Sequence, residues 1–342
     1  MIFSPNLDSP LYYLTKKQLF NQYRRLANPI YLKSCQFFGA TLIDRTKTLE
    51  SGFEFEIIDK IPVSTSSLSF EEICTNRAKD IVFQNKKALN ILWSGGIDST
   101  VALISILKVL DNQFDISRLK VLLSKESIKE YPSFYNDVIQ KHLNHTIIDG
   151  TIYENIYSND TIITGEHGDQ LFGSDKLKYT VISKDAFSNY ENILDFVISR
   201  KLGTNKFTDE IINYLSPFVK KCPFKVSTLY DYLWWINFGL KWQTVSMRIL
   251  SGIGRNSYNL EKDVFHFFKS DEFQIWSINN HCRKIKTEWN SYKYIAKDLI
   301  YNFHKDEDYL LNKEKEPSLK EVIKIRTKPL KMVWNKNSHK KT

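Results

Sequence analysis

The chain has 342 residues with a formal net charge of +9, and 42% of its residues are hydrophobic and 25% charged. This length allows two domains, or one core with sizeable extensions, and the composition is that of an ordinary soluble globular protein. No apolar run approaches the length of a membrane span, and residues 1–5 lack the features of a secretory signal. We therefore expect a cytoplasmic protein without a membrane partner, whose charge permits an acidic partner such as a nucleotide or nucleic acid.

Cysteine usage points to a reducing compartment. The four cysteines are far apart in the sequence and form no paired CxxC spacing: Cys35, Cys74, Cys222 and Cys282. We expect scattered reduced thiols, and neither a zinc site nor disulfide bonds.

Residues 1–85 form the least regular part of the sequence. The alternation of apolar and acidic residues over 53–58 predicts a strand, and Ser69 followed by Glu72 predicts a capped helix start. We expect a small N-terminal α+β region with a structural or partner-binding role.

Residues 86–185 alternate between strand and helix patterns. Helices are predicted over 98–110 and 131–143, and apolar runs predict four strands: 89–93, 119–123, 145–148 and 161–164. Such alternation implies a parallel sheet with right-handed crossovers, whose ligands bind at the carboxyl ends of the strands.

A short polar turn, residues 94–99 (Ser-Gly-Gly-Ile-Asp-Ser), joins the first predicted strand to its helix. Glycines let the backbone approach an anion closely, and the first free amides of a helix point at it. The hydroxyls of Ser94 and Ser99 are further donors, whereas Asp98 would repel phosphate unless a divalent cation lay between them. The turn therefore indicates a metal-bound nucleotide, although a glycine-rich turn can also merely connect a strand to a helix.

A second motif, residues 164–173 (Thr-Gly-Glu-His-Gly-Asp-Gln-Leu-Phe-Gly), follows the strand predicted at 161–164. Its two acidic residues can serve different tasks, with Asp169 completing a cation site with Asp98 and Glu166 acting as a base or electrostatic group at the reacting carbon. The alternative is a polar loop whose acidic residues face water.

Together the two motifs resemble those of the N-type ATP pyrophosphatases (the PP-loop family), most closely the synthetase domain of asparagine synthetase and β-lactam synthetase. The resemblance implies a Rossmann-like (adenine nucleotide alpha hydrolase-like) core that binds ATP and Mg²⁺, with Asp98 and Asp169 as the metal ligands. It also implies a glutamate base, Glu166, and a C-terminal lysine, Lys315 or alternatively Lys313, that offsets charge during acyl transfer. The implied nucleotide-binding residues are Leu92, Ser94, Gly95, Gly96, Asp98, Ser99, Leu122 and Gly165.

The sequence departs from this family in several places. Residue 2 is Ile2 where glutamine-dependent members carry a cysteine nucleophile, and residues 1–85 are too few for their glutaminase domain. His167 replaces the usual glycine and Gln170 the usual glutamate. Residues 245–248 match a family helix, but of the signature that follows only Arg255 is a plausible remnant. The acceptor substrate is therefore left open, and His167 is either a hydrogen-bonding loop residue or a catalyst.

Beyond residue 185 the pattern is mostly helical, with helices predicted over 189–202, 208–219, 227–249 and 289–302. Trp234, Trp235 and Trp242 are more typical of core packing than of a base-stacking platform. We expect four regions along the chain: 1–85, the ATP-binding core 86–185, a helical part 186–335 and a basic tail 336–342.

The sequence thus predicts an α/β protein with a parallel Rossmann-like core, a small N-terminal region and a mainly helical C-terminal extension. The function predicted is that of an asparagine synthetase-like, ATP-dependent, AMP-forming carbon–nitrogen ligase. Its partners would be a small-molecule carboxylate and ammonia or an amine. Two alternatives remain open, namely adenylation of a nucleic-acid base and a non-catalytic nucleotide-binding protein.

Overall fold

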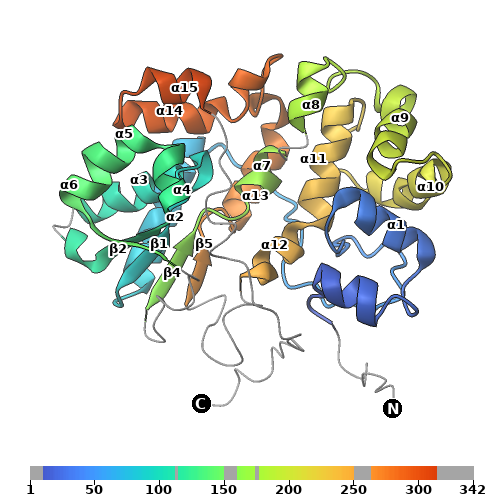
Figure 1. Ribbon diagram of the computed structural model, residues 1–342, viewed down its shortest axis with the longest axis horizontal. Helices are drawn as coiled ribbons and strands as arrows, with labels where there is room; N and C mark the ends of the chain where they lie inside the picture. Colours follow the sequence, from blue (N-terminus) through green and yellow to red (C-terminus); the bar gives the residue numbers. More distant parts are fainter. Residues whose placement is uncertain (1–10, 112–114, 150–159, 174–176, 250–262, 314–342) are drawn as a thin grey trace, which may run out of the picture. The chain divides into compact units, whose positions relative to one another are not determined.

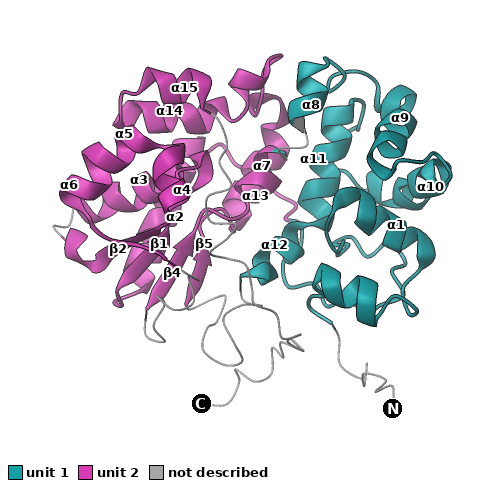
Figure 2. Cartoon of the chain, in the orientation of Figure 1, with its two compact units in different colours: residues 1–61, 173–251, 327–342 teal, residues 62–172, 252–326 magenta. Residues whose placement is uncertain are grey.

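The computed structural model describes residues 11–111, 115–149, 160–173, 177–249 and 263–313 (Figure 1). These residues form two compact units, and each unit is assembled from segments that are distant in the sequence (Figure 2). Among the described residues, unit 1 holds 11–61, 173 and 177–249, and unit 2 holds the rest. The four sequence regions expected above remain a prediction about domains.

Unit 2 contains a five-stranded sheet in which all neighbouring strands are parallel, in the order β3-β2-β1-β4-β5 (Figure 1). The strands are β1 (Leu89–Leu92), β2 (Leu119–Leu123), β3 (Asn144–Ile147), β4 (Thr161–Thr164) and β5 (Val264–His266). The predicted α/β fold with a Rossmann-like parallel sheet is confirmed. Four of the strands lie where the sequence predicted them, and β5 was missed.

Helices connect and flank these strands. Those of unit 2 are α2 (Phe70–Gln84), α3 (Ile97–Asp111), η2 (Ile116–Arg118), α4 (Lys125–Glu130), α5 (Pro132–Phe134), η3 (Tyr135–Ile139), α6 (Gln140–His142), α7 (Gly168–Phe172), α13 (Asp271–Asn279), η6 (His281–Arg283), η7 (Trp289–Ser291), α14 (Tyr294–Phe303) and α15 (Glu307–Asn312). The predicted capping box is confirmed at α2, where Ser69 Oγ accepts from the Glu72 amide at 3.2 Å. The helix predicted over 131–143 is interrupted by the π-helical turn η3.

Unit 1 is mainly helical around an aromatic core. Its helices are η1 (Gln18–Gln22), α1 (Pro29–Phe38), α8 (Leu177–Ile182), α9 (Tyr190–Leu202), α10 (Thr208–Val219), α11 (Leu229–Leu240) and α12 (Trp242–Arg248). Trp234, Trp235 and Trp242 are fully buried, and Phe238 lies between Trp234 and Trp242 with ring centroids 4.9 and 5.5 Å away. These tryptophans therefore pack the core.

The single helix predicted over 227–249 is divided into α11 and α12 at Lys241. The carbonyl of Leu240 accepts from the amide of Ile43 at 2.8 Å, and the carbonyl of Gly239 accepts from the amide of Arg45 at 3.4 Å. Because these bonds come from a distant segment, they end the helix without any local sequence signal.

The strand predicted over 53–58 is wrong. Only Phe55 forms a bridge, with Leu11, and the Gln243 side chain takes the neighbouring backbone groups instead. Its Nε2 donates to the carbonyl of Glu56 at 2.7 Å, and its Oε1 accepts from the amide of Ile58 at 3.0 Å. A side chain has replaced the strand partner that the alternation would need.

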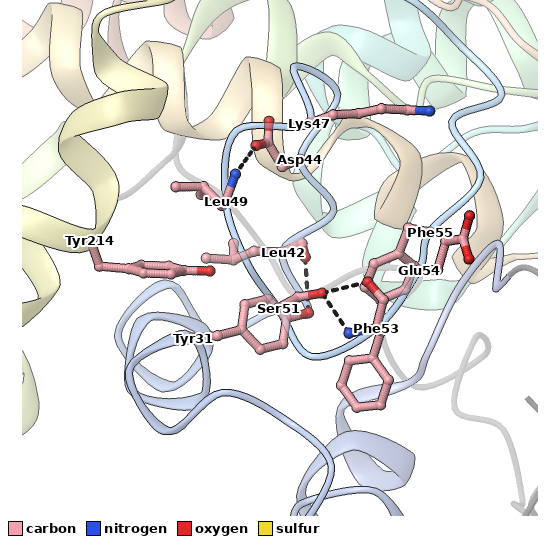
Figure 3. A pocket seen from close by; sticks show the side chains of 10 residues that line it. All are labelled: Tyr31, Leu42, Asp44, Lys47, Leu49, Ser51, Phe53, Glu54, Phe55 and Tyr214. Carbon is pink, nitrogen blue, oxygen red and sulfur yellow. Dashed lines mark hydrogen bonds between the residues drawn. The ribbon is translucent and has the colours of Figure 1, made fainter.

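The loop after α1 lines a cavity of about 230 Å³ in unit 1 (Figure 3). Asp44 fixes this loop, because its carboxylate accepts hydrogen bonds from the amides of Thr46, Thr48 and Leu49 at 2.6–2.8 Å. None of the residues predicted to bind nucleotide lines this cavity.

Candidate functional site

The predicted nucleotide-binding residues converge at the carboxyl ends of β1 and β4. Leu92, the last residue of β1, is paired with Leu122 on one side and with Thr164 on the other. The chain leaves β1 toward β2 and β3, and later returns on the opposite side of β1 as β4. Parallel sheets bind their ligands at such a change of direction, because the loops that follow the two strands diverge there.

The turn after β1 is closed by its own serines. Ser99 Oγ lies 3.0 Å from the amide of Ser94 and 2.9 Å from Ser94 Oγ, and it donates to the carbonyl of Gly96 at 3.1 Å. Gly95 has a φ of +74°, and a Cβ there would overlap the carbonyl oxygen of Ser127. The sequence Ser-Gly-Gly thus gives a compact turn in which Gly95 is required both by backbone conformation and by space.

Two glycines of the second motif are required by the first motif. A Cβ on Gly165 would lie 2.6 Å from the amide nitrogen of Ser99, and a Cβ on Gly168 would overlap the carboxyl group of Asp98. The backbone that follows β4 therefore packs directly against the start of α3. The two motifs, more than sixty residues apart in the sequence, interlock in one site.

Asp98 and Asp169 meet at a lysine that the sequence reasoning missed. Lys293 Nζ lies 2.6 and 2.8 Å from the two carboxylate oxygens of Asp98 and 2.8 Å from Asp169 Oδ1. The Lys293 side chain is 4% exposed, against 21% for Asp98 and 37% for Asp169. The backbone at Lys293 has a φ of +58°, in the left-handed region that few residues other than glycine adopt. A buried ammonium group, carried by a residue in a strained backbone conformation, therefore bridges the two predicted metal ligands.

The protonation of Lys293 follows from this placement. Burial by itself lowers the pKa of the Lys293 ammonium, but the carboxylates of Asp169 and Asp98 outweigh burial and hold that pKa above its usual value. Lys293 therefore stays charged at neutral pH and balances part of the negative charge of the site.

Asp98 and Asp169 are carboxylates, the side chains that commonly hold Mg²⁺ together with substrate phosphates. In this structure both converge on the Lys293 ammonium, which occupies the point that they share. Within the described residues no group of three or more His, Cys, Asp or Glu side chains is placed to hold a metal ion. Asp98 and Asp169 would thus need phosphate oxygens to complete the coordination.

The loop after β4 also positions Glu166 and His167. Thr164 Oγ1 accepts from the amide of Glu166 at 3.2 Å and lies 2.7 Å from Nδ1 of His266, the last residue of β5. His167 is 1% exposed and has a φ of +75°, in the left-handed region that favours glycine. Its ring lies 5.3 Å from that of His266, so it is part of the packed base of the loop.

The C-terminal helices reach the same turn. Tyr309, on α15, donates its hydroxyl to the carbonyl of Gly95 at 3.0 Å and stacks on Tyr131 with ring centroids 3.5 Å apart. Lys313 forms an ion pair with Glu130 at 2.5 Å. Lys313 therefore lies close to the predicted phosphate loop, whereas Lys315, the other candidate lysine, lies outside the described residues.

The remaining predictions concern residues away from this constellation. Arg255 lies outside the described residues, and Ser246 and Met247 are buried in α12 of unit 1. All four cysteines are free thiols in this structure. In the part of the chain that the structure describes, no helix is long and apolar enough to cross a membrane.

A search of protein-family models found no match to the chain, and a search of curated proteins found none either. Any assignment of function therefore depends on the motifs and on the geometry described above.

Proposed function

We propose that unit 2 binds ATP with Mg²⁺, adenylates a substrate carboxylate with release of pyrophosphate, and passes the acyl group to ammonia or an amine. The observation that carries this proposal is the interlock of the loops after β1 and β4, which brings the carboxylates of Asp98 and Asp169 together on one cation, the Lys293 ammonium. A simple connecting turn would need neither the close backbone approach nor a pair of carboxylates at its end.

The loop after β1 would hold the phosphates. Its amides and the hydroxyls of Ser94 and Ser99 are donors of the kind that bind pyrophosphate, and the backbone at Leu92, Leu122 and Gly165 would border the adenine. Mg²⁺ held by Asp98 and Asp169 would neutralise charge on the β- and γ-phosphates. Lys293 holds the two carboxylates together on its ammonium group and adds a positive charge to the site.

In the first step a carboxylate oxygen of the substrate attacks the α-phosphorus of ATP, and the bond to pyrophosphate breaks. In the second step the amine nitrogen attacks the acyl carbon, AMP leaves with the electrons of the carbon–oxygen bond, and Glu166 takes the proton from the nitrogen. Lys313 would offset negative charge near the phosphate loop, and Lys315 remains the alternative lysine.

The test is ATP–pyrophosphate exchange measured against a panel of carboxylates, amino acids and nucleic acids. Exchange that depends on one class identifies the activated group. Asp98→Ala should abolish exchange and weaken ATP binding in the presence of Mg²⁺, whereas Asp115→Ala, a change next to η2, should leave both unchanged. Formation of ADP instead of AMP, or unchanged ATP affinity in Asp98→Ala, would refute the assignment.

The charge of unit 1 favours a second candidate, adenylation of a nucleic-acid base. Among its described residues, eighteen are Lys or Arg and eleven are Asp or Glu. Such an excess supports phosphate-backbone binding, which weakens steeply as salt is raised. Absence of RNA and DNA binding at low salt would eliminate this candidate and leave the small-molecule ligase.

A further inference from the structure

Glu130 and Lys313 form a buried ion pair beside the proposed phosphate loop. The Lys313 and Glu130 side chains are only 7% and 3% exposed. A Cβ built on Gly96 would lie 3.2 Å from Glu130 Oε1, and one on Gly95 would lie 2.9 Å from Glu130 Cβ. The oxygen that accepts from Lys313 is therefore the one nearest to Gly96.

A carboxylate in this position is electrostatically unfavourable for an anion. An unneutralised Glu130 would repel phosphate at short range and in a partly dry environment, where such repulsion is strong. The Lys313 ammonium cancels that charge while the pair is intact. An incoming phosphate and Glu130 must then compete for the same ammonium group.

The rest of α15 can stay in place while this exchange occurs. Tyr309 anchors the helix on the Gly95 carbonyl, and Lys297 Nζ donates to the carbonyl of Leu310 at 3.2 Å. Lys313 follows the end of α15 and carries its ammonium group on a long flexible side chain. The ammonium can therefore change its partner while the helix keeps its position.

We propose that Glu130 is a positioning residue that holds the Lys313 ammonium beside the loop, and that Lys313 leaves Glu130 for the phosphate when a polyphosphate binds. This inference rests on the proposed function, because it requires that the loop bind phosphate. In the ligand-free protein, the Lys313 ammonium would thus be the counter-ion of Glu130.

The test is the affinity for inorganic pyrophosphate with Mg²⁺, measured by calorimetry and paired with thermal unfolding. Glu130→Gln should bind pyrophosphate about fivefold more tightly or better, because the competing charge is gone, although the variant unfolds at a lower temperature. A merely structural ion pair would lower stability without raising affinity. Glu126→Gln, in the first turn of α4, is the matched control and should leave the affinity for pyrophosphate unchanged.

The double variant Glu130→Gln/Lys313→Gln removes both charges of the pair together, so it keeps the test valid even where Glu130→Gln fails to fold. It should bind pyrophosphate more weakly than the wild type, since Lys313 can no longer reach the phosphate. Two results would overturn the proposed transfer of Lys313 from Glu130 to the phosphate. One is wild-type affinity in the double variant, and the other is unchanged or weaker affinity in Glu130→Gln. Absence of pyrophosphate binding in the wild type and in every variant would instead overturn the proposed function, and this inference with it.

Discussion

The two units differ in how they hold buried charge. Among the described residues of unit 1, Arg45 is the buried charged side chain, and it donates to the carbonyls of Asp59, Lys60 and Phe238 at 2.8–3.3 Å. In unit 2, Lys297 also donates to backbone carbonyls, but Lys293 and the Glu130–Lys313 pair are held by other ionisable side chains. A cation saturated by backbone carbonyls stabilises the fold, whereas one held by carboxylates can exchange its partner for a ligand.

The largest effect should come from Gly168→Ala. The new methyl group would overlap the Asp98 carboxyl, so the two loops must separate, and we expect ATP–pyrophosphate exchange to fall by about 100-fold or more. The matched control is Gly203→Ala in unit 1. Gly203 has a φ of +71°, but a Cβ added there would have nothing within 4 Å. The substitution should cost only about 1 kcal/mol of unfolding free energy and leave exchange intact. Equal loss of exchange in both variants would erase the contrast between the units.

Lys293→Met should be next. It leaves Asp98 and Asp169 facing each other without a cation, and we expect a loss of about 2–3 kcal/mol in the free energy of unfolding at pH 7, because both carboxylates are partly exposed. Added Mg²⁺ should recover part of this stability.

Arg45→Met is the matched change in unit 1. It should cost a similar amount by leaving carbonyls unsatisfied, with no recovery by Mg²⁺. If Mg²⁺ restored stability in both variants, or in neither, the buried cations of the two units would not differ in whether a ligand can replace them.

Trp235→Phe should have a smaller effect. It removes the hydrogen bond from Trp235 Nε1 to the Phe218 carbonyl at 3.0 Å while keeping an aromatic ring. The free energy of unfolding should therefore fall by about 1–2 kcal/mol. ATP–pyrophosphate exchange at 25 °C should not change, because the ring packs unit 1 and contacts no predicted site residue. Chemical denaturation and the exchange assay measure the two quantities on one preparation.

The smallest effect concerns Lys297 and pH. Burial, followed by the charge of Lys313, lowers the pKa of Lys297 to about 8 from its ordinary value of 10.5. Between these two values the unfolded chain binds more protons than the folded one, so this group adds stability as pH rises from 8 toward 10.5. Between pH 7 and pH 10, the free energy of unfolding of the wild type should therefore rise by up to about 1 kcal/mol relative to that of Lys297→Met, as measured by thermal unfolding. A relative loss over that interval would show that the sign is wrong.

Local patterns predicted unit 2 well. The runs that became β1, β2 and β4 are apolar and flanked by polar turns, and the two glycine-containing motifs follow β1 and β4 directly. The strand β5 was missed because it has three residues inside an aromatic-rich run, Val264 to Phe268, that is too short for a period to be recognised.

Lys293 could not be found in this way. It lies 195 residues from Asp98 in sequence, and only the tertiary fold brings the two together. A lysine between Tyr292 and Tyr294 is the one local hint, since a charge flanked by aromatic residues is often partly buried. Glu130 gave no signal at all, because an acidic residue at the end of a short helix is ordinary. The same limit applies to α11 and α12, whose break depends on amides from Ile43 and Arg45.

The close approach of Gly165 and Gly168 to the start of α3 also bears on the rate of ligand binding. We expect loops packed this closely to open together, so the proposed phosphate end of the site would be formed before any ligand arrives. Association of pyrophosphate should then be a fast step whose rate increases linearly with concentration. A slower phase that saturates with concentration would belong to the release of Lys313, and it should disappear in Glu130→Gln.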